Sequence, residues 1–328
     1  MIGVVSYLVF FLTGALILAI AVLGLNLQWG NTGIFNGGVA AFFGAGAYGL
    51  IILGGPERLG EFGGFELPYA IAMLGGIGLA GLLALIVGVV TANLRHDYLA
   101  IATFGVAIAV ESVVRNAEYL FGGAKGVRGF QRPLEAFVGD PFVYSLLFLI
   151  LVSACLAAVY AGLERIVRSP YGRLLRGIRE DETAARALGK SPAAVRLQSF
   201  VLGAMIMGLA GGLYATFYAF VSPQDIAPIL TFQIWAMLIV GGAGNNRGAI
   251  MGTLIVWGGW VASGWGLAKF APADWQLYAG TIQYIMIGLI IVVTLLVRPK
   301  GLFPEELTVS TNAALPAGQN NRTGERET

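Results

Sequence analysis

Apolar residues run along most of this chain in long blocks, and short polar stretches separate the blocks. A bilayer core of about 30 Å is crossed by about 20 apolar residues in a helix, so each block of this length predicts one span. The pattern therefore predicts an all-α, polytopic bundle of about nine transmembrane helices, within a range of roughly eight to ten. The predicted spans are 5–24, 34–54, 68–92, 97–117, 142–163, 197–220, 229–243, 249–268 and 277–297.

Two of these spans differ from the rest. The seventh is short, and it lies between Pro223 and Pro228 on one side and the glycine-rich run 241–244 on the other. Because proline and glycine interrupt helices, we expect a broken or re-entrant helix there. The first span has no Lys or Arg before Asn26, so it lacks the basic region of a signal peptide and is expected to be retained.

The composition agrees with a membrane protein and argues against other classes. Hydrophobic residues make up 57% of the chain and charged residues 12%, against about 45–50% and about 25% in soluble domains. The formal net charge of +2 gives no reason to expect a nucleic-acid partner. With one cysteine, Cys155, and one histidine, His96, we expect no metal site and no catalytic residues.

Positive charge is concentrated between the fifth and sixth spans, where eight of the 20 Lys and Arg residues lie. Such loops stay in the cytoplasm, so the N-terminus is expected outside and the C-terminus inside. Residues 1–307 then form one transmembrane domain that includes the cytoplasmic segment 164–196, and the polar residues 308–328 form a disordered cytoplasmic tail. The eight basic residues are Arg165, Arg168, Arg173, Arg176, Arg179, Arg186, Lys190 and Arg196.

The cytoplasmic segment predicts one amphipathic helix over 173–188, ended by Gly189 and Pro192. Such a helix could fit a groove on a cytoplasmic partner or lie on lipid headgroups. The acidic run 180–182 favours a protein partner, since anionic lipid would repel three carboxylates. A helical wheel places Tyr171, Leu174, Ile178, Ala185 and Leu188 on one side, and Arg173, Arg176, Arg179 and Arg186 on the other.

Residues 24–49 combine polar side chains with many glycines between two apolar blocks. Polar groups and irregular backbone at membrane depth are tolerated only where protein or water covers them, and transporters use such segments to contact solutes. The stretch is therefore a candidate transport path or a cytoplasmic turn capped by asparagines. Its polar residues are Asn26, Gln28, Asn31, Thr32 and Asn36.

Four smaller features can each be interpreted as structural or as functional. Glu111 and Arg115 have the spacing of a structural ion pair on one helix face, although charged groups in membranes are also functional candidates. Stripes of small residues, such as those at 76, 80, 84 and 88, indicate tight helix packing or a moving seam. The run 241–248 is a loop or a second docking contact. The motif at 188–191 resembles a phosphate loop but has Ala184 where glycine is required, so it is not a nucleotide site and any ATP hydrolysis must come from another chain.

Six segments resemble the permeases of branched-chain amino-acid ABC importers, in particular the larger of the two permease types. The resemblance spans roughly residues 20–303, and departs from the family at Val39, often histidine, and at Phe121, often threonine. The segments are GLNLQWGNTGIFNGG at 24–38, AAFFGAGAY at 40–48, DYLAIATFG at 97–105, RSPYGRLLRGIREDETAARALG at 168–189, TFQIWAMLIVGGAG at 231–244 and RPKGLF at 298–303.

The resemblance implies a multi-pass permease in the bacterial inner membrane that imports branched-chain or related amino acids. It implies as partners a second related permease, two cytoplasmic ATPase subunits that use ATP and Mg²⁺, and an external solute-binding protein. This chain itself would hold no cofactor. The alternatives are urea, amides or aromatic acids as solutes, or an ion-coupled secondary transporter.

The resemblance also implies two sets of site residues. The expected ATPase-coupling residues are Arg173, Arg176, Arg179, Glu180, Asp181, Ala184, Ala185 and Gly189. The expected transport-path residues are Asn26, Gln28, Trp29, Asn31, Thr32, Asn36, Gly37 and Gly38.

Overall fold

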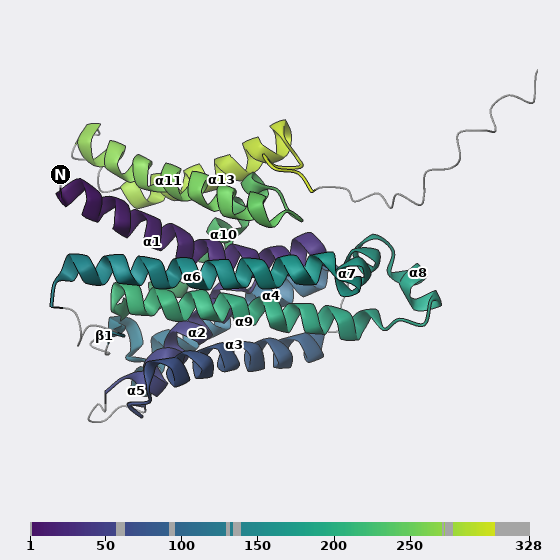
Figure 1. The fold of residues 1–328 in the computed structure, drawn as a ribbon, viewed down its shortest axis with the longest axis horizontal. Helices are drawn as coiled ribbons and strands as arrows, with labels where there is room; N and C mark the ends of the chain where they lie inside the picture. The colour runs from purple at the N-terminus through teal and green to yellow at the C-terminus, as the bar shows by residue number, and fades with distance from the viewer. Residues whose placement is uncertain are drawn as a thin grey trace, which may run out of the picture.

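The fold was obtained as a computed structural model, which describes residues 2–56, 63–91, 96–128, 132–133, 139–270, 272 and 278–305. The predicted tail at 308–328 lies outside these residues. The chain forms a bundle of roughly parallel and antiparallel helices (Figure 1). Its longer helices are α1 (Ile2–Leu25), α2 (Val39–Gly54), α3 (Tyr69–Thr91), α4 (His96–Asn116), α6 (Pro141–Arg168), α7 (Pro170–Glu180), α9 (Pro192–Tyr218), α10 (Pro228–Gly241), α11 (Asn246–Phe270) and α13 (Ala279–Val297).

Short elements join these helices. A π-helix, η1 (Asn26–Asn31), continues α1 without a break, and α8 (Glu182–Ala187) follows α7. Two short strands pair antiparallel, with Val127 opposite Val221, and tie the segment after α4 to the end of α9. The remaining short elements are α5 (Glu118–Phe121), η2 (Gly123–Lys125), β1 (Val127–Arg128), β2 (Phe220–Val221) and η4 (Pro223–Ile226).

The predicted membrane bundle is confirmed. In the described part of the chain, seven helices are long and apolar enough to cross a membrane, and two shorter apolar helices, α2 and α10, accompany them. The prediction of a full span over 34–54 is wrong at its start, because residues 33–38 are irregular and the helix begins at Val39. The seventh span is short as predicted, and η4 precedes it.

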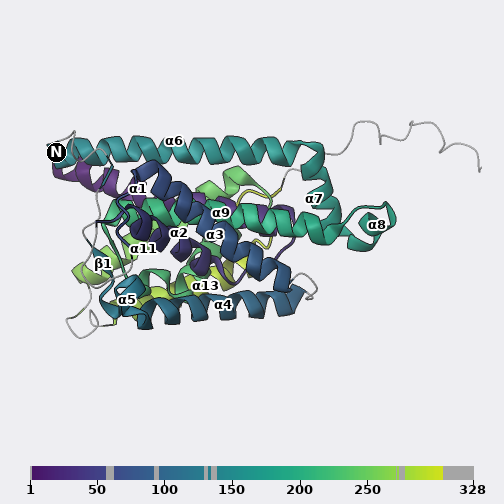
Figure 2. The ribbon, with the colours of Figure 1, turned by 90° about the horizontal axis from the view of Figure 1, so that it is seen from below.

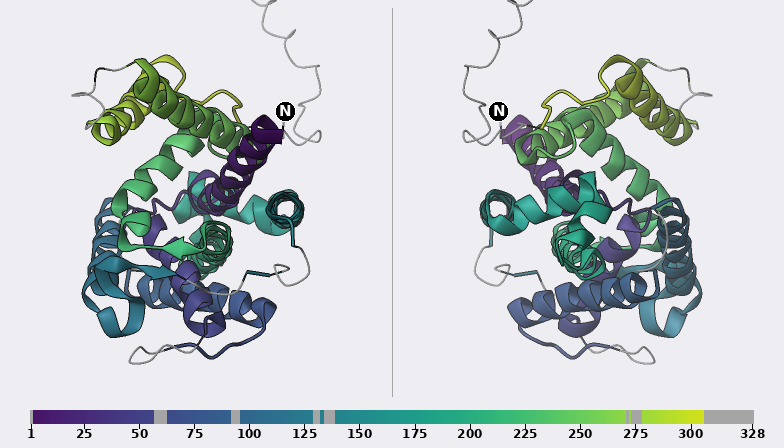
Figure 3. Two further views of the ribbon diagram at one scale, coloured as in Figure 1. Left: turned by 90° about the vertical axis from the view of Figure 1, so that its left-hand side faces the viewer. Right: turned by 90° about the vertical axis from the view of Figure 1, so that its right-hand side faces the viewer.

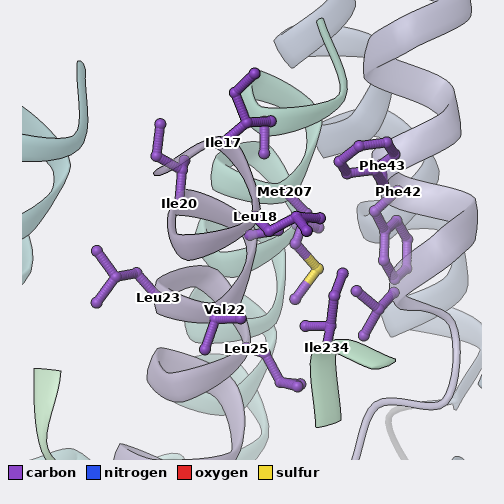
Figure 4. Packing of buried hydrophobic residues seen from close by; sticks show 14 of the residues in the cluster. Ile17, Leu18, Ile20, Val22, Leu23, Leu25, Phe42, Phe43, Met207 and Ile234 are labelled. Atoms are coloured by element: carbon purple, nitrogen blue, oxygen red, sulfur yellow. The ribbon is translucent and has the colours of Figure 1, made fainter. Parts of the chain in front are cut away.

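Helices α1 and α9 form the centre of the bundle, and α13 lies at its margin (Figure 3). The apolar window of α1 is 72% buried and that of α9 67%, whereas that of α13 is 6% buried. Side chains from α1, α2, α9 and α10 pack around Met207 (Figure 4), which is fully buried. The exposed apolar faces of α3, α4 and α13 suit contact with lipid tails.

Small residues let α2, α3 and α9 approach closely, as their stripes predict. A Cβ atom on Gly46 of α2 would overlap the backbone of Gly208 in α9, and one on Gly76 of α3 would lie 2.6 Å from the Gly46 carbonyl oxygen. Ala80 and Ala84 of α3 are fully buried. Since apolar side chains gain little from leaving lipid, this close packing is a main source of cohesion between the three helices.

The side of the bundle that faces the cytoplasm stays a prediction from the positive charges. The structure does place the N-terminal end of α1 at one end of the bundle, and α7 and α8 at the opposite end (Figure 1). The segment after α13 reaches the α7 end as well, because Arg179 of α7 forms an ion pair with Glu305. This relative arrangement is the one that the charge pattern requires, and we refer to the α7 end as the inner end.

Replacing Gly46 with valine tests the packing of α2 on α9. We expect a loss of about 3 kcal/mol in stability, the upper end of overpacking costs, because the clash is with backbone that cannot rotate away. The matched control is Gly78→Val in α3, where an added Cβ meets nothing within 4 Å. Thermal unfolding in detergent checks this prediction, and equal midpoints for the two variants would contradict it.

Candidate functional site

The segment between α6 and α9 projects from the inner end of the bundle. Helix α7 leaves α6 at a sharp bend, and α8 extends beyond the ends of the other helices (Figure 2). Ser169 lies at the bend, where its hydroxyl accepts a hydrogen bond from the Gly172 N–H at 3.4 Å and caps α7. The proline that follows it, Pro170, suits the first position of a helix because it needs no hydrogen-bond partner there.

The prediction of one continuous helix over 173–188 is wrong. Asp181 adopts an extended conformation that ends α7, and its carboxylate accepts hydrogen bonds from the N–H groups of Thr183 at 2.9 Å and Ala184 at 3.0 Å. An aspartate in this arrangement caps a new helix, so α8 begins at Glu182. The Asp181 side chain binds backbone N–H groups and so favours a helix start over a continuous helix. Hydrophobic periodicity contains no information on such side-chain to backbone bonds.

The predicted apolar side of this segment is largely buried against the chain itself. Of the residues predicted on this side, Ile178 of α7 is 1% exposed and Ala185 of α8 is 8% exposed, while Tyr171 and Leu174 are half-buried. Leu188 is 79% exposed at the end of α8, and Leu175, which the wheel did not place on this side, is fully buried. The helices therefore do not offer a free apolar stripe to lipid or to a partner, and Leu188 is the apolar side chain that they leave open.

The charged residues of the segment fall into two groups. Arg173, Glu180, Asp181 and Arg186 are exposed, as are the small residues Ala184 and Gly189. Glu182 lies between two arginines, with N–O distances of 2.5 Å to Arg186 and 2.6 Å to Arg196, and so ties α8 to α9.

Arg176 and Arg179 belong to the second group, which faces inward. The guanidinium of Arg176 donates to the Val167 carbonyl at 3.5 Å. Arg179 donates to the Gly30 carbonyl of η1 and, at 2.8 Å, to the Glu305 carboxylate. The wheel correctly separates both arginines from the apolar residues, but it contains no information on acceptors elsewhere in the chain, and these acceptors turn Arg176 and Arg179 inward.

Tyr171 adds a contact between α7 and α9. Its hydroxyl donates to the Gln198 side-chain oxygen at 3.2 Å, and burial raises the pKa of the phenol. The group therefore stays protonated and able to donate at neutral pH.

Residues 26–38 lie buried at the same end of the bundle. The first part forms η1 and the rest is irregular. Trp29, Phe35 and Trp235 form an aromatic cluster, in which the rings of Phe35 and Trp235 stack at 4.3 Å. The polar side chains are at most 2% exposed in Asn26, Gln28, Asn31, Thr32 and Asn36.

These polar side chains bond mainly within the protein. Gln28 donates to the Phe200 carbonyl of α9 at 2.7 Å and accepts from Asn36 at 2.8 Å. The hydroxyls of Thr32 and Ser199 lie 2.7 Å apart. The Asn31 amide oxygen is the exception, since it has no hydrogen-bond partner among the described residues. The segment is therefore a buried cross-link between helices and not an exposed turn.

Backbone groups of the irregular part also find side-chain partners. The Gly37 N–H donates to the Thr103 hydroxyl of α4 at 2.9 Å, and the Gly38 N–H to the Asn36 side chain at 2.7 Å. Trp235 of α10 donates to the Asn36 carbonyl at 2.9 Å. Residues predicted for the transport path are thus brought together with α4, α9 and α10.

The residues Asn26, Gly30, Arg179, Gly244 and Glu305 meet at one place, which we name the inner junction. Asn26 accepts from the Gly244 N–H at 2.8 Å, and Arg179 connects Gly30 with Glu305. Four of the six segments that carry the family resemblance lie here or adjoin it. The two predicted sites, one in α7 and α8 and one in residues 26–38, are therefore in direct contact.

Hydrogen bonds extend the inner junction to α6 and α11. Asn26 donates to the Asn246 side chain at 2.9 Å, and Asn246 donates to Glu164 at 3.1 Å. Glu164 also forms an ion pair with Arg168, at 2.8 Å. The chain of contacts runs from the buried segment to Arg168, the last residue of α6.

Sequence reasoning assigned no individual role to Glu164, Asn246 or Glu305, although Glu164 lies in the segment 164–196 and Asn246 in the run 241–248. A signal for Glu305 existed, because the motif at 298–303 ends two residues before it. The loop 242–245 is covered by this motif, with hydrogen bonds from the N–H of Leu302 to the Val240 carbonyl at 2.9 Å and of Phe303 to the Gly241 carbonyl at 3.0 Å. Of the run 241–248, residues 242–245 form the loop between α10 and α11, and its own chain covers this loop, while the remaining residues belong to the two helices.

Other candidate features have modest roles. Glu111 and Arg115 form an ion pair with each other on α4, which fits the structural interpretation. Val39 is fully buried and Phe121 packs edge-on against Tyr48 at 5.4 Å. Among the described residues, no three His, Cys, Asp or Glu side chains lie close enough to hold a metal ion.

Comparison with known proteins assigns the fold to a family. Residues 7–295 match the family described as branched-chain amino acid transport system, permease component. The chain belongs to this family. The permease is thus a multi-pass membrane protein and a transport subunit.

Three similar proteins are permeases too. The permease is 27% identical to the high-affinity branched-chain amino acid permease LivM of Salmonella typhimurium, over 89% of this chain and 69% of that protein. It is 28% identical to LivM of Escherichia coli, over 86% of this chain and 66% of that protein. It is 24% identical to the autoinducer 2 import permease LsrC of an Enterobacter strain, over 59% of this chain and 55% of that protein.

Replacing Asp181 with alanine tests the helix break. Loss of the capping carboxylate should destabilise α8 by about 1 kcal/mol, and hydrogen exchange of the amides in 183–188 should become faster. Asp181→Asn is the matched control, because its side-chain oxygen can still accept. Equal exchange in both variants would show that the cap does not hold α8.

Proposed function

We propose that this chain is the membrane-spanning permease subunit of an ATP-binding-cassette importer that moves branched-chain or related amino acids inward. It works with a second related permease, two ATPase subunits on the cytoplasmic face of the bacterial inner membrane and an external solute-binding protein. ATP and Mg²⁺ act in the ATPase subunits, and this chain contributes transport and not catalysis. The observation that carries the proposal is the direct contact between α7 and the buried polar segment 26–38 at the inner junction.

The free surface of α7 and α8 supports docking of the ATPase. An exposed leucine, Leu188, stands at the end of the projection, next to Gly189 in the chain and four residues after the exposed Ala184, and the exposed charged residues Glu180 and Arg173 lie on α7. An apolar anchor with a charged rim is typical of a protein interface. The internal packing of Leu175 and Ile178 fixes this projection on the bundle, so that a push on it reaches the bundle.

The polar segment 26–38 supports passage of a zwitterion near it. Among its side chains, Asn31 has a buried amide oxygen that can accept a hydrogen bond from a solute. The Gly30 carbonyl now accepts from Arg179, and the Gly33 N–H donates to the Trp29 carbonyl at 2.9 Å. If these groups are freed when the path opens, a C=O group can bind the ammonium of the solute and an N–H group its carboxylate. Hydrogen bonds that now join Gln28, Asn36 and Phe200 would exchange partners when the path opens.

The choice of solute follows the similarity to the two LivM permeases, whose names state branched-chain amino acids. Similarity to an autoinducer 2 permease shows that relatives of this fold carry unlike solutes. Urea, amides and aromatic acids therefore remain the alternative solutes, and ion-coupled transport remains the alternative mechanism. Both alternatives are separated from the proposal by transport measurements.

Uptake by the reconstituted complex tests the function. With the binding protein outside and ATP enclosed, labelled leucine should accumulate, and unlabelled isoleucine or valine should compete while urea should not. Removing ATP should abolish uptake, and dissipating proton and sodium gradients should not change it. Uptake that needs a gradient and no ATP would contradict the importer and favour a secondary transporter.

Replacing Gly189 with tryptophan tests the docking surface. Gly189 has a positive φ of 71° and nothing within 4 Å of an added Cβ, so the indole would project toward the partner. We expect insertion in the membrane to persist, with co-purified ATPase and uptake lowered by about tenfold.

Gly189→Asn is the matched control, because asparagine tolerates this backbone conformation better than other side chains. It should retain the ATPase. Normal uptake in the tryptophan variant would remove Gly189 from the interface.

A further inference from the structure

Arg179 differs from the other arginines of the cytoplasmic projection in what it contacts. Its side chain is 24% exposed, against 66% for Arg186. One terminal nitrogen donates to the Gly30 carbonyl and the other to Glu305. Because both ends of the guanidinium are occupied inside this chain, Arg179 is not placed to contact a partner from solution.

The backbone around Gly30 suits an arginine partner in both its electrostatics and its conformation. Gly30 lies in the last turn of η1, where carbonyl groups lack helical partners and the dipole favours a cation. Gly33 has a positive φ of 74°, and a Cβ there would lie 2.9 Å from the Arg179 Cγ atom. The aliphatic part of the Arg179 side chain therefore packs directly against the backbone of residues 30–33.

The Glu305 side comes from a third part of the chain. Residues 302 and 303 are bound along the end of α10, through backbone hydrogen bonds to Val240 and Gly241. Glu305 then packs against Gly244, where an added Cβ would lie 3.0 Å from its carboxylate carbon. Its carboxylate is 2.8 Å from Arg179, and the side chains are 24% and 20% exposed, so water screens the pair less than a surface pair.

We infer that Arg179 is a positioning residue that links movement of α7 to residues 26–38, and that Glu305 holds it in place. This inference rests on the proposed function, since the movement of α7 is supplied by the ATPase. It assigns Arg179 a role inside the chain, whereas Arg173 on the same helix faces the partner. The planar guanidinium suits this role because it spans two acceptors in fixed directions, which a lysine ammonium does not.

The first test uses the permease alone. Hydrogen exchange of the amides in 24–38 should become faster in Arg179→Ala and in Glu305→Gln, because both variants weaken the contact between Arg179 and the Gly30 carbonyl. Arg173→Ala is the matched control on the same helix and should leave these amides unchanged. Exchange in 24–38 that is equal in all three variants and the wild type would overturn the inference, whatever the ATPase does.

The second test uses the whole complex. In Arg179→Ala, ATPase subunits should still co-purify, while solute transported per ATP hydrolysed should fall by about tenfold, the effect expected for losing a charged hydrogen bond. Arg179→Lys should recover part of this ratio, and Glu305→Gln should lower it less than Arg179→Ala. Arg173→Ala should instead weaken retention of the ATPase.

The possible outcomes distinguish the role of Arg179 from the proposed function of the whole chain. Loss of the ATPase in Arg179→Ala to the extent seen in Arg173→Ala would make Arg179 a docking contact and overturn the inference. An unchanged ratio of transport to hydrolysis would overturn it as well. A wild-type complex that retains no ATPase would count against the proposed function, while the exchange experiment would still decide the role of Arg179. If Arg179→Ala fails to fold, Glu305→Gln supplies the same two measurements.

Discussion

Every backbone N–H and C=O group that is buried in a membrane protein needs a partner inside the protein, and residues 26–38 meet this need without an α-helix. Their partners come from side chains of distant helices, such as Thr103 of α4 and Trp235 of α10. The same bonds fix where those helices end relative to one another. The satisfied irregular segment therefore organises the inner end of the bundle, and the contacts of α7 are built on it.

The hydrophobic pattern predicted the helices because the length and polarity of each block are local properties. It also placed α7 and α8 at the end opposite the N-terminus, since positive charge is counted loop by loop. The break at Asp181 was missed because one capping carboxylate outweighs the periodicity around it. The direction of Arg179 could not be predicted, since its acceptors belong to Gly30 and Glu305, which lie 149 and 126 residues away.

The helix bundle and the projection at its inner end differ in how tightly they are packed. Between α2, α3 and α9, backbones meet with little space for side chains, so these helices are expected to move as one body. At the projection, Leu188 and the small residues Ala184 and Gly189 are exposed. A rigid body and an exposed tip, joined by the ion pairs of Arg179 with Glu305 and of Glu182 with Arg196 and by the buried side chains of α7, can pass on displacement without deforming the core.

The separation of Arg179 and Glu305 along the chain has a consequence for how the protein is made. A ribosome exposes α1 and α7 well before the residues that follow α13, so the guanidinium first occurs without its carboxylate partner. During that interval, of the two acceptors that Arg179 has in the finished chain, the Gly30 carbonyl is present and the Glu305 carboxylate is not. Completion of the inner end therefore waits for synthesis of the segment around residue 305, and nascent chains that stop earlier would expose a charged, half-formed surface to chaperones and proteases.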